Sequence, residues 1–77
     1  MERYDLRKLK AKFYDRMIEV IEKDAKPGEV IIFMFEVGDF SSVQKSSDIM
    51  KELGHQVMNS IKFNEVDWTL VVKRKSN

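Results

Sequence analysis

Apolar and polar positions along the chain predict a strand, then a helix, in the first third. Residues 3–9 alternate roughly, with Tyr4 and Leu6 on one side and charged residues on the other, which is typical of a short, half-exposed strand. Between residues 12 and 25 the apolar positions recur at spacings of three and four, which predicts an amphipathic helix. This helix must end before Pro27, because proline lacks an amide hydrogen and disfavours helical backbone in the preceding residue.

The middle of the chain predicts a buried strand and a second helix. Residues 30–35 are consecutive apolar residues, too few for a helix and rich in β-branched and aromatic types, so we expect a central strand that is the most buried of all. Residues 38–42 form a turn with oxygen-bearing side chains that can cap a helix start. Gly54 suits the left-handed position that often ends a helix. The predicted inward residues of this helix are Val43, Ile49, Met50 and Leu53.

The last third alternates in two runs, residues 57–63 and 68–73, which predict a β-hairpin. The element order is then β-α-β-α-β-β, and right-handed crossovers place both helices on the same face of the sheet. We therefore predict an α/β (α+β) two-layer sandwich: a four-stranded mixed sheet with two helices on one face, forming a single domain over residues 1–77. The opposite face is expected to be open to water or to a partner. The predicted core contains Met17, Ile21, Ile32, Phe33, Met50 and Leu53, although Ile32 and Phe33 point in opposite directions.

Composition restricts the chemistry of the chain. Fourteen Lys and Arg against 13 Asp and Glu leave a formal charge of +1, so no strong field attracts nucleic acid or anionic lipid. Basic residues gather near both ends, and we interpret the tail Lys73-Arg74-Lys75 as solubilising. No apolar run reaches the ~18 residues of a membrane span, so we expect a cytoplasmic protein without membrane association. The lack of cysteine excludes disulfides, thiolate zinc sites, iron–sulfur clusters and cysteine nucleophiles, and we expect no cofactor.

Several short motifs, taken in order, resemble the TusA (SirA-like) sulfur-carrier family. They are Asp5-Leu6-Arg7 followed by Leu9, then Pro27-Gly28-Glu29, Gly54-His55 and Val72-Lys73-Arg74. The resemblance covers nearly the whole chain. Members of that family carry a persulfide on the cysteine of a Cys-Pro-x-Pro motif, and its four positions fall here on Ala11, Lys12, Phe13 and Tyr14. The stretch 66–70, which contains Trp68, is similar to that of cysteine-free relatives with the same fold.

The resemblance implies a scaffold without the sulfur chemistry. Alanine has no nucleophilic atom, so no persulfide can form at residue 11. We therefore expect a non-catalytic TusA-like binding or regulatory module, not an enzyme, whose partner is a protein such as a sulfur-relay or redox protein. The alternative is a small nucleic-acid-associated protein that uses its basic ends, which the low net charge and the lack of a paired aromatic stacking motif disfavour.

Two groups of residues are candidate binding sites, with ordinary solvated surface as the alternative for both. Basic side chains at a helix start oppose the helix dipole without structural benefit, so we expect a partner-binding surface there. Glu36 and Asp39 follow the central strand, where α/β sheets usually bind ligands, and are candidate ligand-binding residues. His55 has no clustered partner and is interpreted as structural, which leaves an enzyme that uses it the weakest hypothesis. The candidate partner-binding residues are Arg7, Lys8, Lys10, Lys12, Phe13 and Tyr14, of which one aromatic must face the core.

Overall fold

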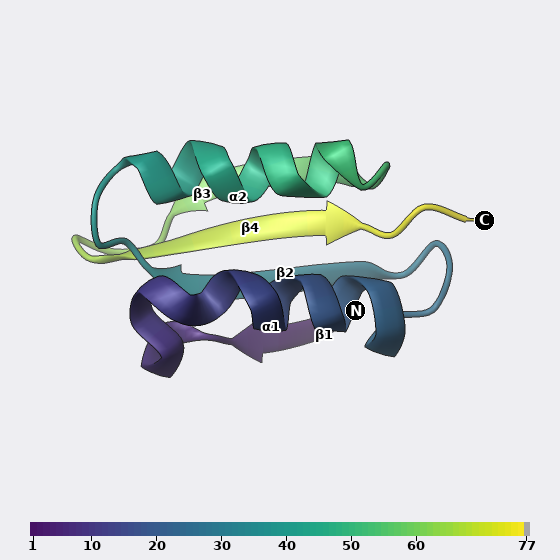
Figure 1. Cartoon of the computed structure of the whole chain (residues 1–77), viewed down its shortest axis with the longest axis horizontal. Helices are drawn as coiled ribbons and strands as arrows, with labels where there is room; N and C mark the ends of the chain where they lie inside the picture. The colour runs from purple at the N-terminus through teal and green to yellow at the C-terminus, as the bar shows by residue number, and fades with distance from the viewer. Residues whose placement is uncertain (77) are drawn as a thin grey trace.

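The computed structural model describes residues 1–76 as a four-stranded sheet with helices on one side (Figure 1). The strands are β1 (Glu2–Asp5), β2 (Val30–Glu36), β3 (Gln56–Lys62) and β4 (Asp67–Lys73). The helical elements are the 3-10 segment η1 (Arg7–Lys12), α1 (Phe13–Glu19), the π-helical turn η2 (Val20–Asp24) and α2 (Ser41–Glu52). The strand order is β1-β2-β4-β3, with β1 parallel to β2 and the other neighbouring pairs antiparallel. The predicted two-layer fold is confirmed.

The first strand is shorter than predicted because the chain turns away from the sheet after Asp5. The Asp5 carboxylate accepts a hydrogen bond from the Arg7 backbone N–H at 3.1 Å, and the Leu6 N–H donates to the Met34 carbonyl at 2.7 Å. Residues 7–9, predicted as strand, therefore begin η1. The helix predicted over residues 12–25 is α1 extended by η2, where the Ala25 N–H donates to the Val20 carbonyl at 2.8 Å.

Alternation along β2, the most buried strand, assigns its side chains to the two sheet faces. Ile31, Phe33 and Phe35 face the helices and are fully buried, whereas Ile32 points to the other face and is half-buried. Ile32 therefore lies outside the core, which corrects the prediction for that residue. Phe13 stacks on Phe35, with ring centroids 4.3 Å apart and planes inclined by 6°. Of the other predicted core residues, Met17, Ile21, Phe33 and Met50 are fully buried and Leu53 packs against them.

Small residues line the inward side of α2. Ser42, Ser46 and Met50, spaced four apart, are buried, whereas the predicted inward residues Val43 and Ile49 are only half-buried. The helix is thus rotated relative to the prediction. Small side chains let the helix lie close to the sheet, and the Ser46 hydroxyl donates to the Val43 carbonyl at 3.0 Å, so its burial leaves no unmet hydrogen bond.

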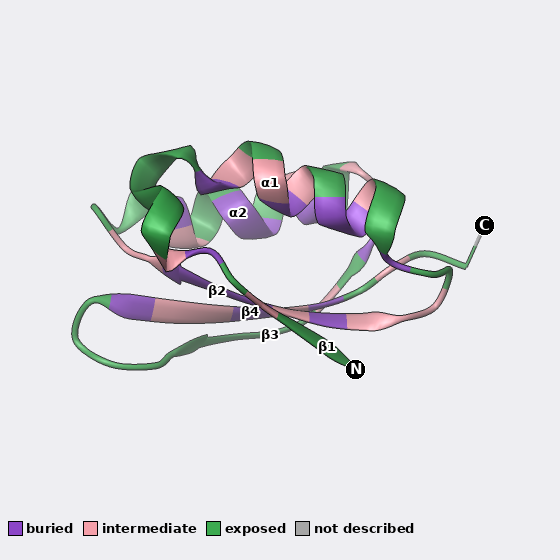
Figure 2. Ribbon diagram, turned by 90° about the horizontal axis from the view of Figure 1, so that it is seen from below, coloured by how far each residue is buried: buried purple, intermediate pink, exposed green. Residues whose placement is uncertain are grey.

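Both helices lie on one side of the sheet, and the other face is uncovered (Figure 2). The edge strand β3 contains a bulge, because its pairing with β4 shifts between Val57 and Asn59. No helix within residues 1–76 has the length and apolar character needed to cross a membrane.

Hydrogen bonds hold the basic tail against the body of the protein. The Arg74 guanidinium donates to the Ala25 carbonyl, and the Lys75 ammonium donates to the Leu53 carbonyl at 3.1 Å. Two of the three basic side chains in the predicted solubilising tail therefore have structural contacts.

Candidate functional site

Three strand ends meet at one end of the sheet and bring charged side chains together. The parallel strands β1 and β2 end there, at Asp5 and Glu36, and the antiparallel strand β4 begins there, at Asp67. The segment that follows β1 passes over the same end. An open cleft of about 800 Å³ results, lined by Asp5, Arg7, Lys8, Lys10, Glu36, Val66 and Asp67.

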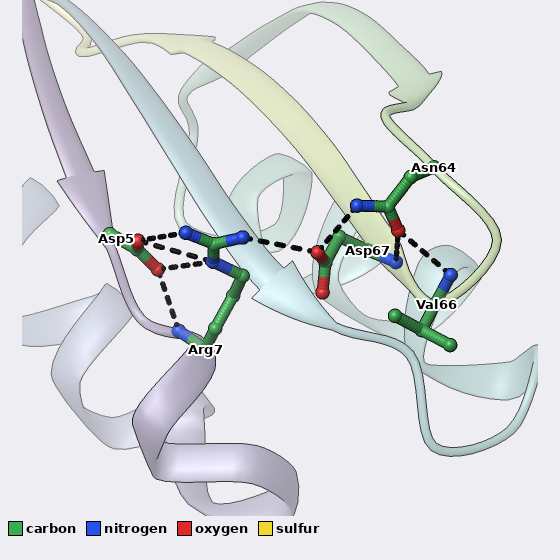
Figure 3. A network of polar contacts seen from close by, with 5 residues as sticks. All are labelled: Asp5, Arg7, Asn64, Val66 and Asp67. Carbon is green, nitrogen blue, oxygen red and sulfur yellow. Dashed lines mark hydrogen bonds and ion pairs between the residues drawn. The ribbon is translucent and has the colours of Figure 1, made fainter.

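The Arg7 side chain lies between two carboxylates in this cleft (Figure 3). Its Nη2 atom is 2.6 Å from Asp5 Oδ2, and its Nη1 atom is 3.2 Å from Asp67 Oδ2. The Asn64 amide donates to Asp67 Oδ2 at 2.8 Å, and its oxygen accepts the backbone N–H groups of Val66 and Asp67. The Asp67 side chain is only 7% exposed, so these donors offset the cost of burying its charge. The network joins the β3–β4 turn to the end of β1.

Hydrogen bonds within the network stabilise the charged forms of its members. Those from the Arg7 side chain lower the pKa of Asp5 to about 2, and the same bonds, followed by the one to Asp67, raise the pKa of Arg7. Because two carboxylates neutralise Arg7, the available positive charge of the cleft is on Lys8 and Lys10. The Lys10 ammonium is 73% exposed and lies 3.6 Å from Glu36 Oε1, whereas Lys8 forms no ion pair within 4 Å inside residues 1–76.

The backbone of Lys10 has an unusual conformation. Its φ of 48° and ψ of −125° fall in a region that residues other than glycine rarely occupy. This residue divides η1 into two short turns. Strained backbone of this kind concentrates at functional sites in proteins, so the strain supports a functional role for Lys10.

An apolar hollow of about 420 Å³ adjoins the charged cleft and shares Val66 and Asp67 with it. The Phe40 ring is 74% exposed and meets the Trp68 ring edge-on, with centroids 5.8 Å apart. The Trp68 indole N–H donates to the Ser60 hydroxyl at 2.7 Å, which fixes the orientation of the ring. Exposed aromatic side chains beside a polar rim are typical of protein interfaces. The remaining residues of this hollow are Val37, Lys62, Asn64 and Glu65.

The structure distributes the predicted site residues over several places. Phe13 is buried in the core and cannot reach a partner, which corrects its inclusion in the predicted surface. Lys12 is exposed outside the cleft. Tyr14 and Asp39 line a separate small hollow of about 100 Å³ at the start of α2. The predicted residues that the fold brings together in the cleft are Arg7, Lys8, Lys10 and Glu36.

Tyr14 and Asp39 have structural contacts in that small hollow. Burial, and then the negative charge of Asp39, raise the pKa of Tyr14, whose ring also lies 4.8 Å from the Lys45 ammonium. The Ser41 hydroxyl and backbone N–H donate to the Asp39 carboxylate and lower its pKa. Asp39 therefore holds the turn that begins α2.

His55 lies at the opposite end of the sheet from the cleft, just before β3 begins. Its Nδ1 atom accepts a hydrogen bond from the Lys75 N–H at 3.0 Å, and its Nε2 atom lies 3.4 Å from Glu22 Oε2. Burial lowers the pKa of His55. The geometry gives no support to an active site that combines His55 with Glu36 and Asp39. In the part of the chain that the structure describes, no group of three or more histidine and acidic residues is arranged to hold a metal ion.

Sequence reasoning missed Asn64, Val66 and Asp67, which complete the cleft from a distant part of the chain. Asp67 is 60 residues from Arg7 in sequence. A signal was present: in the predicted mixed sheet, the start of an antiparallel last strand lies near the carboxyl ends of its parallel neighbours. Asn64 and Asp67, three residues apart in the turn, are typical of a side chain that caps a turn.

Fold and cleft together define a small two-layer α/β domain with charged side chains at one end of a mixed sheet. Residues 1–74 match the family described as the E chain of a "putative NADH-ubiquinone oxidoreductase". The solution structure of HP1264 from Helicobacter pylori is 53% identical in sequence, with a TM-score of 0.69 over 97% of this chain and 99% of that protein. Comparison with curated proteins finds no match. The protein belongs to the family of NADH-ubiquinone oxidoreductase E chains.

This family assignment shows that the resemblance to the TusA (SirA-like) family was wrong. The resemblance depended on element order and on short motifs at element ends. A Pro-Gly pair ends a helix in any fold, and glycine ends many helices, because both act on local backbone conformation. Such features identify a β-α-β-α-β-β protein but do not distinguish one family with that order from another.

Proposed function

We propose that this chain is a non-catalytic, protein-binding subunit that acts together with an NADH-ubiquinone oxidoreductase in the cytoplasm. Family membership over residues 1–74 supports the connection with the oxidoreductase. Thiolates hold iron–sulfur clusters, and the chain has no cysteine to provide them. Its contribution is therefore binding, without a thiolate-held redox centre.

The charged cleft is the observation that carries this proposal. Its walls are ordered before any partner arrives, because Arg7 is held by Asp5 and Asp67. A preorganised surface loses little conformational entropy on binding. Lys8 and Lys10 offer exposed ammonium groups to carboxylates of a partner, and the neighbouring Phe40 offers an apolar contact.

Co-purification tests the proposal. An affinity-tagged chain, produced in its native cell, is expected to retain NADH-oxidising activity and the oxidoreductase subunits identified by mass spectrometry. Lys8→Glu combined with Lys10→Glu should reduce the retained activity by about tenfold, since two favourable charge contacts become repulsive. Lys51→Glu is the matched control, because Lys51 is an exposed lysine of α2 outside the cleft.

The proposal fails if the tagged wild-type chain retains no oxidoreductase subunit, or if both variants retain as much as the wild type. Circular dichroism of the purified variants checks that the charge reversals preserve the fold.

The alternative of nucleic-acid association has less support. The side chains of Arg74 and Lys75 donate to backbone carbonyls, so the basic tail presents fewer free charges than its sequence indicates. A salt-dependent gel shift with the purified chain would favour this alternative.

A further inference from the structure

The face of the sheet without helices is apolar at its centre (Figure 2). The register of β2 and β4 places Ile32, Met34 and Val71 on this face, around a shallow hollow of about 210 Å³. The edge strand β3 extends the apolar surface. Exposed large apolar side chains there are Met58, Ile61 and, just after the strand, Phe63, with exposed fractions of 51%, 52% and 57%. A contiguous apolar patch marks an interaction site more often than isolated exposed residues do.

Charges at the two ends of this bare face have opposite signs. Lys73 is paired with Val30 in the register and Arg3 with Ile32, so both basic residues lie toward the end remote from the cleft. Glu36 and Asp5 lie toward the cleft end. Within residues 1–76, neither Arg3 nor Lys73 takes part in an ion pair within 4 Å.

We propose that the bare face binds a second copy of this chain in a two-fold symmetric dimer, with the strands of the two sheets antiparallel. Two face-to-face arrangements have two-fold symmetry. An axis parallel to the strands places like ends together and sets acidic residues over acidic residues. An axis across the strands places Lys73 and Arg3 of each copy over the acidic end of the other, so charge complementarity selects the antiparallel arrangement.

The antiparallel arrangement also joins the most exposed apolar residues. Rotation about an axis across the strands keeps each strand over its own counterpart, so β3 lies over β3 of the second copy. Met58, Ile61 and Phe63 of both copies are then buried together. Packed sheets lie about 10 Å apart, with apolar side chains interdigitating between them.

The size of the face suits a dimer of ordinary interface area. The longest extents of the molecule are 35 and 19 Å. These dimensions correspond to a surface on the order of 700 Å², close to the roughly 800 Å² that each partner buries in a standard interface. The dimer is independent of the proposed oxidoreductase partner, and a monomeric chain would leave that proposal unchanged.

Sedimentation equilibrium of the purified chain, from micromolar to near-millimolar concentration, tests the dimer. We expect a monomer–dimer equilibrium. Ile61→Lys should raise the dissociation constant by about tenfold or more, because it places a charge at the centre of the apolar contact. Leu9→Lys is the control, since Leu9 is exposed on η1 outside this face and its replacement should leave the constant unchanged.

A charge exchange tests the direction of the strands. Lys73→Glu should raise the dissociation constant by about threefold, and adding Glu36→Lys should restore it, because each new glutamate then faces a new lysine across the interface. A protein that sediments as a monomer at every concentration overturns the proposal. A dimer that tolerates Ile61→Lys, or that the second charge change weakens further, overturns it equally.

Discussion

At the scale of single residues, Lys10 combines an unfavourable backbone conformation with an exposed charge beside Glu36. We expect Lys10→Gly to raise the free energy of unfolding by about 1 kcal/mol, because glycine adopts positive φ without a steric cost, although it also gains entropy in the unfolded chain. Urea denaturation measures the change. Lys10→Ala is the control, since it removes the ammonium and keeps the Cβ atom. An equal gain in both variants would show that the backbone conformation is not the cause.

The cleft shows how far single residues could be identified from the sequence. Arg7, Lys8 and Lys10 were candidates because basic charge near a helix start has no evident structural benefit, and Glu36 was a candidate because it ends a central strand. That these four line one cleft follows from strand order, which local patterns do not determine. Phe13 could not be separated from Tyr14 by sequence, because both occupy inward positions of the same helix turn and only packing on Phe35 decides between them.

At the scale of secondary structure elements, the spacing of α2 from the sheet depends on small residues. Ser46 is fully buried, and its hydroxyl bonds within its own helix. We expect Ser46→Leu to lower the free energy of unfolding by about 1 to 3 kcal/mol, because the larger side chain must push the helix away from the sheet. Ser46→Ala should change it by less than about 0.5 kcal/mol, because no second group is left unpaired. Thermal and urea unfolding measure both variants, and a Leu variant as stable as the wild type would show that α2 is loosely packed.

Elements with a strong hydrophobic pattern were predicted well, and the exceptions have physical causes. The apolar run of β2 and the alternation of β4 identify both strands, because burial on one or both faces requires such patterns. The rotation of α2 was missed because a buried serine counts as polar when its hydroxyl is satisfied within the helix. The early end of β1 was missed because it depends on one hydrogen bond from the Arg7 N–H to the Asp5 carboxylate.

At the scale of the whole molecule, His55 joins three separate segments at the end of the sheet remote from the cleft. It precedes β3, accepts a hydrogen bond from the Lys75 N–H and lies 3.4 Å from Glu22 of η2. Burial lowers its pKa below the ordinary value of 6.5, and the positive charges of Lys75 and Arg74 act in the same direction, while Glu22 opposes them. His55 is therefore neutral in the folded protein at a pH where the unfolded chain already binds a proton.

This difference predicts how stability depends on pH. Above pH 6.5 both states hold a neutral His55, and its contribution to the free energy of unfolding is complete. As the pH falls through 6.5, the unfolded state gains a proton first, so stability decreases until the pH reaches the lower pKa of the folded state. Urea denaturation at a series of pH values between about 7 and 5 measures the slope, and His55→Gln, which cannot titrate, should have a smaller one. Since the acidic residues titrate alike in both proteins, equal slopes would show that His55 is not protonated on unfolding.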